Sequence, residues 1–208
     1  NDVYKTATEA LPRGRGDVVM LHEHFRSHPL IIGFSNRHIY GQKLILKKNP
    51  TEQTSLPIAC GVHSVPVLGQ AERHAGSWLN RPEAEAIVNE IRKIRDGDTR
   101  SVSIGVVTAF RSQKELLVEL LAAEDLATGI LVDTAHGFQG DERDAILFSP
   151  VVSKGISEGT SRWVESPPNL INVALTRARE CLYVVADFDY LKQQQGLLRK
   201  LADYCEKI

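Results

Sequence analysis

A short polar stretch between two apolar runs has the residue types of a binding site. The segment VDTAHGFQGDERDAILFSPVV (132–152) begins and ends on apolar residues, and its middle carries these polar side chains: His136, Gln139, Asp141, Glu142, Arg143 and Asp144. An ordinary turn between two strands needs little more than a glycine or an aspartate. The Glu142 carboxylate can accept hydrogen bonds from hydroxyl groups, and Gly140 lets a backbone approach closely. The pattern predicts a site at this turn. The alternative, a solvated run of charges, is favoured for Asp141, Arg143 and Asp144 but not for Glu142.

Arg177 has a spacing that would place its charge among apolar residues. Leu170, Val173 and Arg177 follow an i, i+3, i+7 pattern, so a helix would align them on one stripe. Arg179 would lie about 200° around the same helix. A charge on an inward stripe needs a partner, and a guanidinium offers planar donors with a permanent charge. The partner is either a phosphate or a carboxylate in a structural ion pair.

Arg26 is the second arginine that could face a phosphate. It follows the apolar run 18–21 and precedes a helix whose start is indicated by Pro29. The alternative is that its guanidinium donates to nearby carbonyl groups at the helix start.

Hydroxyl groups at the ends of two predicted strands could contact the backbone of a nucleic acid. Thr108 and Thr134 each follow an apolar run, and Arg111 and Lys114 could add positive charge. A threonine after a strand is also a common helix cap, and both cations could lie on a solvated helix face. Trp163 could stack on a base, although a single loop tryptophan is more often a packing anchor.

Length and composition indicate one α/β domain spanning 1–208. The chain is 42% hydrophobic and has a formal net charge of -1, so a nucleic acid would have to be held by a local patch. The three cysteines form no CxxC pair, which argues against a disulfide framework and fits a reducing cytosol. No apolar run approaches the roughly 18 residues of a membrane span.

Strand-like and helix-like patterns alternate along the chain. Apolar runs predict strands at 18–21, 62–67, 102–107, 130–132, 145–148 and 181–186. Capping boxes predict helix starts at Asn80–Glu83 and Ser112–Glu115, and Asp187 is expected to cap the last helix. The segments 51–79 and 153–168 are expected to be loop-bearing connections. Alternation of this kind predicts a mainly parallel sheet with helices on both faces, and ligands at the carboxyl ends of its strands.

Four sequence blocks resemble, in order and spacing, the motifs of the second RecA-like domain of superfamily-one helicases. They are LHEHFRSHPLIIGFSNRHIYGQKL (21–44), SIGVVTAFRSQKELL (103–117), DTAHGFQGDERDAILFSPVV (133–152) and NLINVALTRARECLYVVAD (169–187). The chain resembles the branch that includes the nonsense-mediated-decay helicase and its bacterial relatives. Where the family commonly has Tyr-Arg-Met-His-Pro, this chain has FRSHP (25–29). Where the family commonly has Thr-Pro-Tyr, this chain has TAF (108–110), which lacks the tyrosine hydroxyl.

The resemblance implies roles for residues of the nucleotide site. It makes Arg177 the arginine finger and Arg26 a second cation toward the γ-phosphate. It assigns Glu142 to the nucleotide ribose and Gln139, beside Gly140, to coupling between nucleotide and nucleic acid.

The resemblance also implies a division of labour between two domains. Thr108 and Thr134 match family positions that touch nucleic-acid phosphates. No glycine in this chain is followed by lysine, so the sequence contains no GxxxxGK[ST] phosphate loop. The phosphate loop for ATP and the ligands for Mg²⁺ are expected on a RecA-like domain upstream in the same polypeptide.

The sequence as a whole predicts a RecA-like α/β three-layer sandwich that acts as the second motor domain of an ATP-dependent helicase. Single-stranded nucleic acid, DNA more than RNA, is the expected partner, in a bacterial cytoplasm and away from membranes. The isolated chain is expected to be inactive. The alternative is a non-catalytic nucleic-acid-binding or scaffold protein that retains a helicase-like domain. No metal site is expected, because the possible ligands lie inside a helicase motif: His22, Glu23, His24 and His28.

Overall fold

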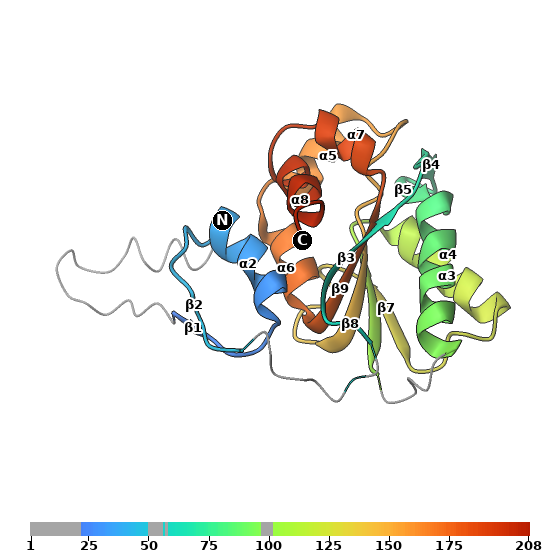
Figure 1. The fold of residues 1–208 in the computed structure, drawn as a ribbon. Coiled ribbons are helices and arrows are strands. Elements are labelled where there is room, and N and C mark those ends of the chain that lie inside the picture. Colours follow the sequence, from blue (N-terminus) through green and yellow to red (C-terminus); the bar gives the residue numbers. More distant parts are fainter. Residues whose placement is uncertain (1–21, 50–55, 57, 97–101) are drawn as a thin grey trace, which may run out of the picture.

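A parallel sheet forms the centre of the molecule. The structure, a computed structural model, describes residues 22–49, 56, 58–96 and 102–208. Its central sheet has five parallel strands in the order β3 (Gly61–Pro66), β9 (Ala178–Ala186), β8 (Arg143–Ser149), β6 (Ile104–Thr108) and β7 (Ile130–Thr134). All carboxyl ends of these strands therefore lie at one edge, the upper one in Figure 1. The predicted α/β fold with a mainly parallel sheet is confirmed, and the predicted strand at 18–21 lies outside the described residues.

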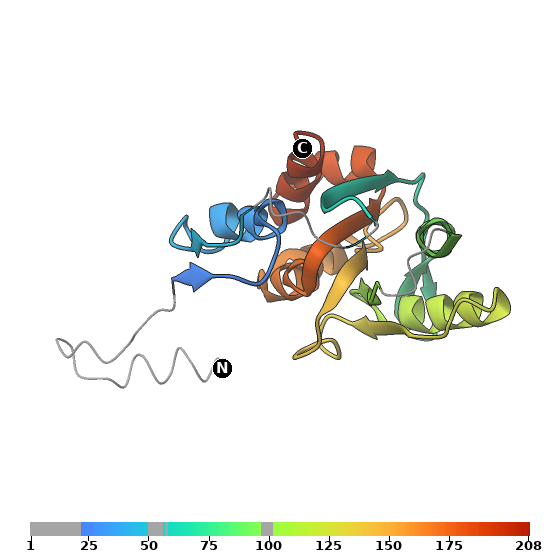
Figure 2. The ribbon, with the colours of Figure 1, turned by 60° about the horizontal axis from the view of Figure 1, so that its bottom comes forward.

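Helices cover both faces of this sheet, as Figures 1 and 2 show. One face packs against α3 (Arg81–Asp96) and α4 (Arg111–Ala123), and the other against α2 (Pro29–His38), α6 (Asn169–Thr176) and α8 (Leu197–Cys205). Neighbouring strand residues alternate between the two cores, since Ala145 and Leu147 pack with α3 and α4 while Ile146 and Phe148 pack on the opposite side. This alternation explains why the middle of β8, 145–148, is continuously apolar: it is buried on both faces.

Smaller elements occupy the connections that we expected to bear loops. The antiparallel hairpin of β4 (Ala71–His74) and β5 (Ser77–Asn80) lies at the end of 51–79 and extends one residue beyond it, and α5 (Glu158–Glu165) lies within 153–168. The sequence analysis did not predict these elements. A further pair of short parallel strands, β1 (Glu23–His24) and β2 (Ile45–Leu46), flanks α2.

Three helix starts test the capping predictions. Half of the Asn80–Glu83 box is present, because Asn80 Oδ1 accepts from Glu83 N at 3.3 Å, but Asn80 N donates to Gln113 Oε1 at 2.7 Å and not to Glu83. The Ser112–Glu115 box is wrong: α4 begins at Arg111, and the Ser112 hydroxyl donates to the carbonyl of His74 at 2.9 Å. Asp187 does cap a helix, but that helix is α7 (Phe188–Gln193), and α8 follows it.

Candidate functional site

The polar segment 135–142 is a crossover between opposite edges of the sheet. It leaves the carboxyl end of β7 and enters the amino end of β8, and because both strands are parallel to β6 it must run along the length of the sheet. Phe138 is 0% exposed, and a Cβ on Gly105 of β6 would lie 2.5 Å from its ring. The core position expected for Phe138 is therefore confirmed, and glycine at 105 leaves room for the crossing.

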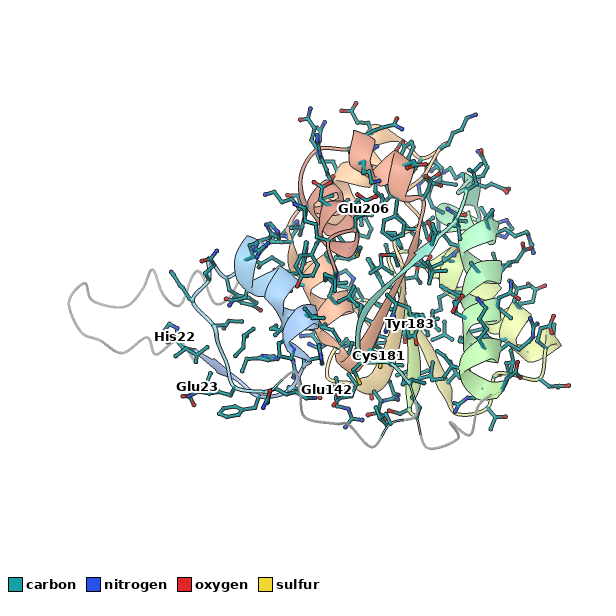
Figure 3. The ribbon with its side chains drawn as sticks, viewed as in Figure 1. His22, Glu23, Glu142, Cys181, Tyr183 and Glu206 are labelled. Carbon is teal, nitrogen blue, oxygen red and sulfur yellow. The ribbon has the colours of Figure 1, made fainter. Side chains whose placement is uncertain are left out.

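The crossover corrects one expectation about the site. Thr134 lies at the carboxyl edge of the sheet, as predicted, but Glu142 lies at the amino edge beside the start of β8. Figure 3 shows Glu142 toward the lower end of the molecule, on the side of the segment that carries His22 and Glu23. The polar residues of this one motif therefore belong to two different surfaces.

Three predicted site residues from distant segments meet at the amino edge. Arg26 Nη1 donates to Glu142 Oε1 at 2.6 Å, and their side chains are 39% and 29% exposed. Arg177 is half-buried beside them, with both charges acting on its guanidinium. The sheet itself aligns these segments: Arg143 N donates to Arg177 O at 3.1 Å, and His28 N donates to Arg179 O at 2.8 Å.

Arg177 occupies the end of α6 and not its interior. The helix ends at Thr176, and Arg177 is the C-cap with φ -76° and ψ -17°. Its Nε donates to Val173 O at 3.3 Å and its Nη1 to Asp141 O at 3.5 Å. The partners found for this charge are carbonyl groups, so the guanidinium keeps donors available for an incoming anion.

Burial and neighbouring charges shape the electrostatics of this cluster. Burial lowers the pKa of Arg177, the positive charge of Arg26 lowers it further, and Glu142 opposes both. Arginine nevertheless stays protonated in proteins. Burial also lowers the pKa of His24, followed by the charge of Arg26, and its Nε2 accepts a hydrogen bond from Ser27 N at 3.1 Å. Near neutral pH the imidazole is therefore neutral, and the two guanidiniums carry the positive charge.

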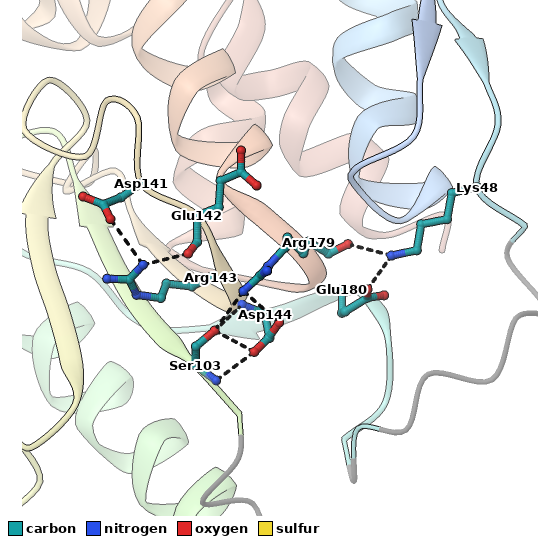
Figure 4. Close-up of polar contacts among 8 residues, drawn as sticks. All are labelled: Lys48, Ser103, Asp141, Glu142, Arg143, Asp144, Arg179 and Glu180. Atoms are coloured by element: carbon teal, nitrogen blue, oxygen red, sulfur yellow. Dashed lines mark hydrogen bonds and ion pairs between the residues drawn. The ribbon is translucent and has the colours of Figure 1, made fainter.

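The charged residues after Glu142 are bonded within the protein and do not form a solvated run (Figure 4). Asp144 accepts from Ser103 N at 2.9 Å and pairs with Arg179 at 3.2 Å. Arg143 donates to the carbonyl of Glu142 at 2.7 Å and lies 3.4 Å from Asp141. The alternative of a solvated charge run is wrong for Asp144 in particular. Arg179 serves this structural network and does not join the Arg26–Glu142 pair.

Gln139 and Gly140 lie in the exposed middle of the crossover. Gln139 lines a hollow of about 250 Å³ together with Ala135, His136, Asn169, Leu170 and Val173. Gly140 has φ +98°, a conformation that side chains disfavour, while a Cβ there would meet nothing within 4 Å. Glycine is thus required here by the backbone conformation.

The two predicted threonines lie together at the carboxyl edge. The backbone links them, because Ala135 N donates to Thr108 O at 3.0 Å. Thr108 is buried at 0% exposure, and its hydroxyl accepts weakly from Phe110 N at 3.5 Å. Thr134 is partly exposed, and its hydroxyl accepts from Gly137 N at 3.3 Å. Of the two, Thr134 is better placed to reach a ligand.

The cations expected near these threonines already have acidic partners. Arg111 pairs with Glu115 at 2.8 Å, and Lys114 pairs with Asp133 at 2.8 Å. Burial raises the pKa of Asp133, but hydrogen bonds from Lys114 and Thr134 N outweigh burial and hold that pKa below its usual value. The carboxyl edge therefore offers less free positive charge than the sequence suggested.

The histidines of the first motif have protein partners. His28 Nδ1 accepts from Leu30 N at 3.3 Å and caps α2, while His22 Nδ1 lies 2.9 Å from Lys43 O. Among the described residues, no group of three or more His, Cys, Asp or Glu side chains could hold a metal ion. Within the same residues, no helix has both the length and the apolar character to cross a membrane.

A buried glutamate was missed as an unusual titrating group. Glu83 is 0% exposed and accepts from Asn80 Nδ2 at 2.9 Å and from Val151 N at 2.9 Å. Burial raises its pKa to about 8, against the opposing hydrogen bonds from Ser149 and Val151. The capping box predicted its place at the helix start, but nothing in the sequence indicated its burial.

Comparison with known proteins identifies the family and several helicase relatives. A family model described as AAA domain matches residues 4–189. The 5'-3' DNA helicase ZGRF1 of Mus musculus is 28% identical over 196 residues, covering 90% of this chain and 10% of that protein. DNA polymerase alpha-associated DNA helicase A of Saccharomyces cerevisiae is 31% identical over 133 residues, covering 64% of this chain and 19% of that protein.

A solved structure shares the fold. The C-terminal domain of a possible DNA helicase from Lactobacillus plantarum superposes with a TM-score of 0.50 at 16% identity, covering 85% of this chain and 92% of that one. The chain spans 10% and 19% of the two curated relatives described above, so it corresponds to a small part of each. These similarities support a superfamily-one helicase domain. By its match over residues 4–189, the chain belongs to the AAA domain family.

Proposed function

We propose that this chain is the second motor domain of an ATP-dependent superfamily-one helicase. The observation that carries the proposal is the meeting of Arg26, Glu142 and Arg177 at the amino edge of the sheet, where Arg26 and Glu142 bond at 2.6 Å. At this exposed edge, the two guanidiniums are suited to bind the phosphates of ATP, and the carboxylate is suited to accept hydrogen bonds from its ribose hydroxyls.

The chemistry assigned to the two arginines is stabilisation of the γ-phosphate. Transfer of that group proceeds with little covalent help from the protein, so positioned positive charge supplies most of the catalysis. Arg177 would act as the arginine finger when the two motor domains close, and Arg26 would add a second cation. Glu142 would accept hydrogen bonds from the ribose.

The residues present fit part of an ATP site. The edge supplies donors for phosphate and an acceptor for ribose, but the sequence contains no phosphate loop. We assign the phosphate loop and the Mg²⁺ ligands to an upstream RecA-like domain of the same polypeptide. Mg²⁺ there would neutralise phosphate charge between the two domains.

The opposite edge is the proposed path of a single strand. Thr134 and Thr108 lie at the carboxyl edge, and the crossover that carries Gln139 joins this edge to Glu142. One short segment thus joins the two proposed binding surfaces, which supports the proposed coupling role of Gln139. The names of the mouse and yeast relatives favour DNA over RNA, and the mouse name favours 5′ to 3′ movement. The cytoplasmic location and the bacterial type stay predictions.

Strand-stimulated ATP turnover by the full-length protein tests the nucleotide site. Arg177→Ala should lower turnover by about three orders of magnitude, the usual effect of losing an arginine finger, while nucleotide affinity falls much less. Arg26→Ala should cause a comparable loss. Arg179→Ala is the matched control, because Arg179 is nearby and bonded to Asp144 at 3.2 Å. Normal turnover in Arg177→Ala with loss in Arg179→Ala would show that the wrong arginine is assigned. A wild-type protein without turnover would favour the non-catalytic alternative.

A further inference from the structure

Trp163 is half exposed to solvent although it lies on a well-packed helix. Its side chain is 47% exposed, and its ring centroid lies 5.5 Å from that of Phe110 at an interplanar angle of 42°. Phe110 itself is only 7% exposed. The pair thus consists of a buried ring that supports a second ring, and the second ring remains open to solvent.

Packing of α5 does not account for this exposed tryptophan. The helix is attached by Val164, at 0% exposure, and by Ser161, at 3% exposure, whose hydroxyl donates to Gln194 at 3.2 Å. A tryptophan that served only to anchor the helix would have a buried ring, just as Val164 and Ser161 have buried side chains. A ligand that covered the exposed half of this large apolar side chain would gain free energy by removing it from water.

The position of Trp163 places it over the carboxyl edge of the sheet. Its partner Phe110 follows Thr108 at the end of β6, and the two are bonded from Phe110 N to Thr108 Oγ1 at 3.5 Å. Ala135, directly after Thr134, donates to Thr108 O at 3.0 Å. The ring therefore belongs to the edge that carries the threonines of the proposed single-strand path.

We propose that the exposed face of Trp163 stacks on a base of the bound single strand, with Phe110 as the positioning residue beneath it. The proposal rests on the proposed function, since it requires a strand at this edge. At this edge, Arg111 is paired with Glu115 and Lys114 is paired with Asp133, so neither cation is free to bind a phosphate. Stacking on Trp163 would supply affinity for the strand that these cations do not. All bases have a flat π-face, so such a contact tolerates any sequence.

The test measures binding of the full-length protein to a short oligothymidylate and to a base-free strand of equal length. Trp163→Ala should weaken binding of oligothymidylate by roughly tenfold, a typical loss for one stacked base, and leave binding of the base-free strand unchanged. Trp163→Phe should retain most of the affinity because it keeps a ring. The dependence of affinity on salt should not change, since no phosphate contact is removed.

Two controls separate stacking from folding and from the proposed function. Trp163→Leu keeps an apolar contact with Phe110 but has no π-face, so it should lose affinity as Trp163→Ala does while keeping the wild-type melting temperature. Equal binding of oligothymidylate by wild type and Trp163→Leu would overturn the stacking proposal alone. A wild-type protein that binds neither strand would instead overturn the proposed function.

Discussion

Arg26 and Glu142 form an ion pair at 2.6 Å although 116 residues separate them in sequence. Each group is therefore satisfied by the other before any nucleotide is present. A ribose hydroxyl that approaches Glu142 competes with Arg26, and a phosphate that approaches Arg26 competes with Glu142. If both groups bind nucleotide as proposed, binding has to exchange this pair for two new sets of hydrogen bonds.

Glu142→Gln should raise the KM for ATP of the full-length protein and leave its free energy of unfolding almost unchanged. The amide keeps an oxygen that can accept from ribose but removes the charge that orients Arg26. Both side chains are partly exposed to water, so the ion pair itself should contribute less than about 1 kcal/mol to folding. Glu23→Gln is the control, because Glu23 forms a more exposed ion pair with Lys47, at 2.9 Å, on the neighbouring β1. Steady-state kinetics and thermal melting of both variants check the prediction. Equal KM values for the two variants would contradict a nucleotide role for Glu142.

The 208-residue chain alone should not hydrolyse ATP at a measurable rate. It supplies arginines, but the sequence holds no phosphate loop to bind the triphosphate. The measurement is phosphate release by the purified chain with and without single-stranded DNA. Strand-stimulated turnover by the pure chain would contradict the proposed division between two motor domains.

Stability should fall as pH rises from about 4.5 to 8 because of Glu83. Burial raises the pKa of Glu83 from its ordinary value of 4.5 to about 8 in the folded protein, so between these values the folded state holds a proton that the unfolded state releases. The stabilising contribution is complete below pH 4.5 and is lost as pH rises through 8, at no more than about 1.4 kcal/mol per pH unit. Urea unfolding at several pH values across this window measures the slope.

Glu83→Gln should reduce that slope, because an amide does not titrate. Glu85→Gln is the matched control: it lies on the same helix, but its side chain is 57% exposed and 4.0 Å from Arg81. It should keep the wild-type pH dependence. An unchanged slope in Glu83→Gln would show that other groups control stability in this range.

The sequence was sufficient to predict the sheet because its central strands, β6 and β8, are buried on both faces. Continuous apolar runs such as 145–148 are typical of strands buried on both faces. The amphipathic helices predicted between these runs can cover the two faces of the sheet. The trio Arg26, Glu142 and Arg177 was predicted from motif resemblance. Its proximity could not be derived from spacing, because it depends on pairing between strands far apart in sequence.

What the sequence did not predict depends on tertiary contacts. Segment 135–142 has the length and composition of a turn, and only the parallel direction of β7 and β8 makes it a crossover with ends at two edges. Ser112 has the signature of a cap, but its hydroxyl bonds to His74 of the hairpin. The hairpin and α5 contain few apolar residues of their own, and neighbouring elements supply their packing.

Thr134→Ala should weaken binding of single-stranded DNA by the full-length protein and lower strand-stimulated turnover more than basal turnover. Thr134 lies at the proposed strand path, where a hydroxyl can donate to a phosphate oxygen, but it also accepts from Gly137 N at 3.3 Å and so supports the start of the crossover. Thr134→Ser keeps the hydroxyl and should restore both properties. Fluorescence anisotropy with a labelled oligothymidylate, thermal melting and ATPase assays on the two variants separate the roles. A threonine that only supports the crossover would lower the melting temperature of Thr134→Ala while its affinity for the strand stayed at the wild-type value, and that result would remove Thr134 from the proposed path.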